Sequence, residues 1–270
     1  MSDPAPPRLS ATILLLRDDP SLQVLMVKRH YEIDFASGAL VFPGGKAHDE
    51  DAVSAWADWT DGDFTGEEQA ARVSAIREAY EESGILLARP RLKRGAGATL
   101  VGHETASAVA PMRSAVDRRE ASFLALMQEH DLVLALDALV HFGHWITPTM
   151  MPKRFDTHFY LAATPPGQIA EQAGRETTEA VWLGPQQALD MEAASEATII
   201  FPTRMNLGKL AETEPADAAL TRFAAEPVIT VLPEVGKDDE GNPCLHIPKE
   251  AGYIQSIEPL KRVANVMKSK

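Results

Sequence analysis

The stretch Arg77-Glu78-Ala79-Tyr80-Glu81-Glu82-Ser83-Gly84-Ile85 carries most of what this sequence says about fold and chemistry. It closes segment 70–83, which is rich in helix-forming residues, and Gly84 follows where a helix C-cap is favoured. On a helix, Glu78, Glu81 and Glu82 stand at i, i+3 and i+4, so their carboxylates share one stripe. Three like charges on one stripe repel each other unless a cation binds them.

Such a stripe suits a hard divalent cation. Mg²⁺ accepts carboxylate oxygens, and waters and substrate phosphates commonly complete its octahedron. Arg77 lies four residues before Glu81 and can pair with it. Glu78, Glu81 and Glu82 are therefore candidate metal ligands. A solvated acidic helix face is the alternative, and the three glutamates alone support it equally well.

A second motif, Val41-Phe42-Pro43-Gly44-Gly45, ends an apolar stretch that begins at Ala39 and reads as a strand. Together the two motifs resemble the Nudix box of Nudix hydrolases: Gly, five residues, Glu, seven residues, then Arg-Glu-hydrophobic-x-Glu-Glu-x-Gly-hydrophobic. The second half of that pattern matches at every fixed position from Arg77 to Ile85. The resemblance favours the metal site over the solvated face. It implies Glu78, Glu81 and Glu82 as metal ligands and Arg77, Glu81 and Glu82 as the catalytic set, with the general base left open.

The first half of the box is split. Residues 46 to 76 separate Gly45 from Arg77, eighteen more than the pattern has. Counting eight back from Arg77 gives Gln69, and counting six forward from Gly44 or Gly45 gives Glu50 or Asp51. The first box glutamate is thus unassigned and is not placed among the metal ligands. The candidates for it are Glu50, Glu67 and Glu68.

The inserted segment 46–68 is acidic and carries Trp56 and Trp59. It reads as a loop or a loosely helical stretch. Since tryptophans supply buried area, we expect it to be ordered and to border the substrate cleft.

The split box, with His144-Trp145-Ile146-Thr147-Pro148 and Arg154-Phe155-Asp156-Thr157, is similar to the Nudix hydrolases of the type of the peroxisomal coenzyme A diphosphatases of animals. The resemblance covers residues 9–211. It implies an α/β fold, the Nudix α/β/α sandwich with a mixed sheet, Mg²⁺ or Mn²⁺ as cofactor, and a small-molecule diphosphate substrate such as coenzyme A or an acyl-CoA. Two alternatives stay open: a diphosphatase for ADP-ribose, a nucleotide sugar or a dinucleoside polyphosphate, and a non-catalytic Nudix-fold binding module.

Four residues are predicted to bind substrate: Gly44, Gly45, Arg29 and Arg154. Arg29 closes a predicted strand before the loop to Gly45, and Arg154 has Phe155 and Asp156 beside it for support. An exposed basic residue is more often merely solvated. The eight histidines show no HExxH-like pairing, so we do not expect a zinc site.

The remaining pattern predicts one domain with additions. Residues 1–8 are a tail, 9–211 the Nudix hydrolase domain, and the proline-rich segment 212–270 an extended chain packing on that domain, with a homodimer interface there left open. Strands are predicted at 9–17, 22–29, 85–87, 157–162 and 179–183, and helices at 70–83, 114–129, 132–140 and 185–191.

Composition excludes several classes of protein. A chain that is 45% hydrophobic and 24% charged is typical of a soluble globular protein. Its net charge of −13 argues against non-specific binding of nucleic acid or anionic membrane. Met1 to Arg8 lack the layout of a secretory signal, and a single cysteine, Cys244, cannot form an internal disulfide. We expect a cytoplasmic protein.

Overall fold

The structure, a computed structural model, describes residues 5–29, 38–171 and 177–263, so parts of the predicted tail and extension lie outside it. Its main sheet has the order β10 (Thr177–Leu183), β2 (Leu22–Arg29), β1 (Arg8–Asp18), β9 (Phe155–Ala163), β8 (Val140–Ile146) and β11 (Thr230–Val231). Short strands β3 (Leu40–Val41) and β4 (Gly44–Lys46) pair with β2 and β1. The sheet is mixed, because β1 runs parallel to β9 and antiparallel to β2.

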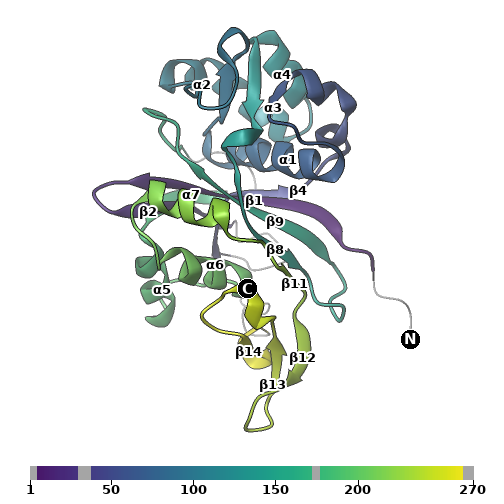
Figure 1. Ribbon diagram of the computed structural model, residues 1–270, viewed down its shortest axis with the longest axis vertical. Helices are drawn as coiled ribbons and strands as arrows, with labels where there is room; N and C mark the ends of the chain where they lie inside the picture. Colours follow the sequence, from purple (N-terminus) through teal and green to yellow (C-terminus); the bar gives the residue numbers. More distant parts are fainter. Residues whose placement is uncertain (1–4, 30–37, 172–176, 264–270) are drawn as a thin grey trace.

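Helices cover both faces of this sheet (Figure 1). Alternate residues of β1 point to opposite faces, so Ile13 and Leu15 join a core under α1 (Gly66–Ser83). Leu14 and Leu16 join a second core, which α5 (Pro185–Ala193), α6 (Phe201–Leu210) and α7 (Ala216–Ala225) cover. The predicted α/β/α sandwich with a mixed sheet is confirmed.

The side of α1 that faces away from the main sheet is covered as well, so this helix lies in the interior of the protein. Its covering layer includes a small sheet ordered β5 (Thr60–Asp61), β7 (Leu132–Ala135) and β6 (Ala88–Pro90). Helices α2 (His103–Val109), α3 (Arg113–Asp117) and α4 (Phe123–Glu129) lie on the same side of the main sheet as α1 (Figure 1). As a result every residue of α1 from Gln69 to Ser83 is buried. Gly84 ends the helix with φ 75°, the left-handed conformation expected of its C-cap.

The insertion is ordered, as expected. It forms two 3₁₀ turns, η1 (Asp49–Ala52) and η2 (Ser54–Asp58), followed by β5. Trp56 is fully buried, its ring centroid lies 5.9 Å from that of Phe123, and its Nε1 donates to the Glu50 carbonyl at 2.9 Å. These contacts hold the insertion against the helical layer above α1.

Three predicted elements are wrong. Segment 132–140 is not a helix: Leu132–Ala135 is β7, and β8 begins at Val140. A short apolar run has no periodicity that separates helix from strand, and here pairing with β5 and β6 decides. Segment 114–129 is split into α3 and α4 around Arg119, whose φ is 57°. The strand predicted at 85–87 begins only at Ala88.

The C-terminal extension is less extended than predicted. It contains α7, whose buried Phe223 meets Phe142 of β8 edge to face at 4.7 Å. The Asp18 carboxylate accepts the Ala216 N–H at 3.1 Å at the start of α7. Beyond α7 lies a separate sheet of β12 (Glu234–Lys237), β13 (Pro243–His246) and β14 (Ile257–Pro259) (Figure 1). Within the described ranges, no helix is both long and apolar enough to cross a membrane.

Candidate active site

The three predicted ligands all lie inside the molecule. Glu78, Glu81 and Glu82 are 8%, 5% and 8% exposed, so the solvated-face alternative is ruled out. Burial raises the pKa of Glu78 to about 7, with the Arg77 guanidinium opposing the rise and the Glu81 carboxylate adding to it. Burial also raises the pKa of Glu81, again against Arg77. The site therefore holds carboxylates whose charged form is costly without cations nearby.

Arg77 supplies a positive charge next to these buried carboxylates. Its Nη1 donates to Glu78 Oε1 and to Glu81 Oε2, each at 2.9 Å, which includes the predicted pair with Glu81. Its Nε and Nη2 donate to the two oxygens of Asp51 at 3.0 and 3.1 Å. Burial alone would lower the pKa of Arg77, but the carboxylates of Glu78, Asp51 and Glu81 raise it well above its ordinary value. Arg77 thus stays charged and fixes the positions of its partners.

Asp51 is the functional residue that sequence reasoning missed. It is 1% exposed and lies six positions after Gly45, where the box pattern has its first glutamate. The three candidates named for that position lie elsewhere: Glu50 accepts a hydrogen bond from Ser122, and Glu67 and Glu68 are exposed. The count from Gly45 already pointed to Asp51, but the shorter aspartate was not taken as its equivalent.

Gly44 and Gly45 begin strand β4 and let its backbone approach these carboxylates closely. The Gly44 N–H donates to Glu82 Oε2 at 3.0 Å. A Cβ atom at Gly45 would stand 2.5 Å from Glu78 Oε1, and one at Gly44 would stand 2.6 Å from Thr12 Oγ1. Side chains at either position would collide, which explains why this part of β4 needs two glycines.

One carboxylate oxygen is left over in this arrangement. Glu81 Oε1 is buried and has no hydrogen-bond partner among the residues that the structure describes. An unpaired buried carboxylate oxygen costs free energy, so such an atom is a natural place for a cation to bind. The donor set of Glu78, Glu81 and Glu82 therefore fits a hard divalent metal.

The two predicted arginines differ in their surroundings. Arg29 ends β2, and its buried Nε has no hydrogen-bond partner in the described part of the chain. Arg154 is 9% exposed, and it donates to the backbone carbonyls of Thr147 and Ala5 at 3.0 and 2.9 Å. Asp156, expected to support Arg154, contacts His144 instead. The structure thus engages Arg154 in fixing backbone segments and leaves the buried Arg29 Nε without a hydrogen-bond partner among the described residues.

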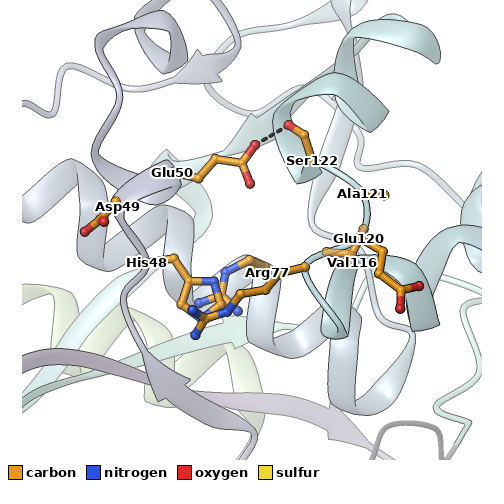
Figure 2. Close-up of a pocket in the computed structure, with 9 residues that line it drawn as sticks. His48, Asp49, Glu50, Arg77, Val116, Glu120, Ala121 and Ser122 are labelled. Atoms are coloured by element: carbon orange, nitrogen blue, oxygen red, sulfur yellow. Dashed lines mark hydrogen bonds between the residues drawn. The ribbon is translucent and has the colours of Figure 1, made fainter.

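A pocket of about 350 Å³ opens beside Arg77 (Figure 2). Glu50 and Ser122, which both line it, point toward each other and are hydrogen bonded, and Arg119 donates to His48 Nε2 at 2.7 Å. Burial and the charge of Arg77 lower the pKa of His48 to about 4. The insertion thus contributes to a pocket next to the carboxylate site. The residues that line it are His48, Asp49, Glu50, Arg77, Val116, Arg119, Glu120, Ala121 and Ser122.

These features define the class of protein. A mixed sheet between helical layers, with a Gly-Gly strand segment against an Arg-Glu-x-x-Glu-Glu helix, is the Nudix fold. A crystal structure of a NUDIX hydrolase from Alicyclobacillus acidocaldarius has the same fold, with a TM-score of 0.68, 24% sequence identity, and coverage of 83% of this chain and 99% of that one.

The chain belongs, more narrowly, to the NUDT19 Nudix domain family, which matches residues 58–210. The acyl-coenzyme A diphosphatase NUDT19 of Xenopus laevis is 26% identical over 230 residues, which cover 72% of this chain and 60% of that protein. The human protein of the same name is 31% identical over 157 residues, covering 54% of this chain and 40% of that protein. The matched segment thus spans less than two thirds of either relative. The predicted subgroup is confirmed.

Proposed function

We propose that this protein is a divalent-metal-dependent hydrolase that cleaves the diphosphate bond of coenzyme A or an acyl-CoA. The observation that carries the proposal is the buried set of Glu78, Glu81 and Glu82 against Gly44 and Gly45 of β4, with Glu81 Oε1 unpaired in the described structure. The substrate class is inferred from the two relatives, which are acyl-coenzyme A diphosphatases. The homodimer and the cytoplasmic location stay predictions.

Glu78, Glu81 and Glu82 would hold Mg²⁺ or Mn²⁺, because hard cations prefer carboxylate oxygens. A bound divalent ion supplies charge neutralisation at the diphosphate and lowers the pKa of the attacking water. The raised pKa of Glu78 supports this role, because burial leaves its carboxylate in need of a nearby positive charge.

The other residues of the chain prepare this reaction. Arg77 acts as a positioning residue, since its hydrogen bonds hold Glu78 and Glu81 in place. Gly44 holds Glu82 through its N–H. Glu81 or Glu82 would take the proton of the attacking water. Arg29 would bind a phosphate, because its buried Nε would otherwise keep an unpaired donor.

The test is a screen with the purified full chain and Mg²⁺. The substrates are coenzyme A, an acyl-CoA, 3′-dephospho-coenzyme A, ADP-ribose, a nucleotide sugar and a dinucleoside polyphosphate, with products identified by mass. We expect adenosine 3′,5′-bisphosphate and the 4′-phosphopantetheine part. Better hydrolysis of ADP-ribose would refute the coenzyme A assignment, and no hydrolysis of any substrate would favour a binding module.

Substitution tests the metal site itself. Glu81→Gln and Glu82→Gln are each expected to lower kcat by about 100-fold or more, because losing a ligand removes several kcal/mol of charge stabilisation and about 1.4 kcal/mol is tenfold in rate. The matched control is Glu67→Gln, an exposed glutamate in the first turn of the same helix, which should keep full activity. Near-normal Mg²⁺-dependent turnover in both site variants would show that the ligands are assigned wrongly.

A further inference from the structure

Strands β8 and β9 carry a cluster of four ionisable side chains outside the carboxylate site: His141, His144, Asp156 and His158. The antiparallel register of these strands places His144 opposite His158 and His141 opposite Tyr160. Asp156 lies two residues before His158, so the two side chains share a face of the strand. Tyr160 belongs to the core under α1, which puts the cluster on the α1 face of the sheet.

The nitrogen and oxygen atoms of this cluster converge. One donor atom from each of His144, Asp156 and His158 lies within 4.8 Å of the others. His144 Nε2 contacts Asp156 Oδ1, and the His144 and His158 rings stack with centroids 4.2 Å apart. His141 is not among these three converging residues, but its Nε2 lies 3.1 Å from His158 Nδ1 and so places a fourth nitrogen beside them. Ligands on a tetrahedral Zn²⁺ lie about 2.0–2.2 Å from the ion, so small side-chain movements would close this set around a metal.

The surroundings also suit metal binding. Burial lowers the pKa of both His141 and His158 to about 4, with a neighbouring imidazole contributing in each case, so both rings are neutral near pH 7. Only a neutral imidazole can coordinate a metal. The Thr230 hydroxyl lies 2.8 Å from His144 Nδ1 and fixes that ring with Nε2 toward Asp156. A hydrogen bond to the second ring nitrogen is the usual support of a metal-binding histidine.

The cluster is separate from the carboxylate site. Ala11 of β1 pairs with His158 on one side and with Gly45 on the other. Strand β1 therefore lies between β9, which carries His158, and β4, which carries Gly45. The backbones of β9 and β4 are two strand spacings apart here, about 10 Å. The donors differ as well, since imidazole suits zinc, copper, iron and nickel, whereas carboxylates alone suit magnesium and manganese. We propose that His144, Asp156 and His158, with His141 as a fourth donor, form a second metal site that binds a divalent transition-metal ion such as Zn²⁺.

The test measures metal binding without reference to activity. The full chain, prepared free of affinity tags and stripped with a chelator, is titrated with Zn²⁺ by calorimetry in millimolar Mg²⁺, and Co²⁺ is titrated separately to read its visible spectrum. We expect one Zn²⁺ per chain that Mg²⁺ does not displace. His158→Ala and His144→Ala should abolish this binding, and Thr230→Val should weaken it by about 10- to 100-fold.

Two controls make the result specific. His103→Ala removes an exposed histidine from α2 and should leave Zn²⁺ binding unchanged. The double variant Glu81→Gln/Glu82→Gln should also keep it, so failure of the proposed catalytic site would not affect this result. The conservative variants His158→Gln and His144→Gln, checked for folding by circular dichroism, replace any alanine variant that fails to fold. Wild-type protein without Zn²⁺ binding, or binding that survives loss of both histidines, would overturn the proposal.

Discussion

Asp51 and Arg77 join two segments that are 26 positions apart in the sequence. Asp51 takes one edge of the guanidinium and leaves Nη1 for Glu78 and Glu81. This division matters because buried charges must be paired, and here three carboxylates share the positive charge of one guanidinium. Without Asp51, the carboxylate partners of Arg77 would be Glu78 and Glu81, two of the proposed metal ligands.

Asp51→Asn is therefore expected to weaken Mn²⁺ binding and to lower turnover, each by about 10-fold or more, as for other residues that orient metal ligands. It should also lower the free energy of unfolding by about 3 kcal/mol, because Arg77 loses a buried partner. Mn²⁺ titration and urea unfolding measure the two effects. Asp49→Asn, an exposed neighbour, serves as the control. Unchanged Mn²⁺ affinity in Asp51→Asn would contradict the positioning role of Arg77.

Gly45 offers a second test at the same scale. In Gly45→Ala the new methyl group would stand 2.5 Å from Glu78 Oε1, so the carboxylate must move. We expect Mg²⁺-dependent turnover to fall about 10-fold or more while the fold is retained, measured by steady-state kinetics and circular dichroism. Gly208→Ala is the matched control, since its Cβ meets only Ile254 Cδ1 at 3.5 Å. Equal activity in both variants would show that Glu78 tolerates displacement.

At the scale of elements, the small sheet above α1 depends on Asp61 at the end of β5. Asp61 is 4% exposed and receives hydrogen bonds from Arg89 and Arg94, each at 2.8 Å, and from the Gly95 N–H at 2.9 Å. Burial alone would raise the pKa of Asp61, but these bonds outweigh it and lower the pKa below its ordinary value. The Asp61 carboxylate thus ties β5 to β6 and to the loop that follows.

Asp61→Asn is expected to lower the free energy of unfolding by about 3 kcal/mol at neutral pH. Since the folded-state pKa of Asp61 is depressed, its contribution is present above the unfolded pKa of about 3.9 and is lost as pH falls through the folded value. The stability gap between wild type and variant should therefore narrow below about pH 4. Urea unfolding across pH 3 to 7 measures this gap, and a gap that widens in acid would contradict the assignment.

At the scale of the whole molecule, the C-terminal extension and the Nudix body share one core. Phe223 of α7 packs with Phe142 of β8, and Leu245 and Ile247 belong to the same buried cluster. Arg204 of α6 pairs with Glu258 of β14 at 2.5 Å and with Glu192 at 3.1 Å. We therefore propose that the segments 9–211 and 212–270 unfold together, although they differ in composition.

Phe223→Ala tests this coupling. Truncation of a buried phenylalanine costs about 3–5 kcal/mol, and each kcal/mol lowers Tm by roughly 2–4 °C in a chain of this size. We expect one transition at a lower temperature, followed by calorimetry and by the near-ultraviolet signal of the tryptophans. Thr221→Ala, an exposed position on α7, should leave Tm nearly unchanged. Two separated transitions would show that the extension unfolds on its own.

Local patterns were enough to predict the central strands, the helix that ends at Gly84 and the family, because periodicity, capping and box spacing lie within short stretches of sequence. They also placed Glu78, Glu81 and Glu82 on one stripe. Tertiary structure decided the rest. Only the layer above α1 shows that the stripe is buried, only folding of the insertion brings Asp51 to Arg77, and only strand pairing makes Leu132–Ala135 a strand. The register of β8 and β9 likewise joins His144 to Asp156 and His158, because contacts between residues distant in sequence depend on which strands pair.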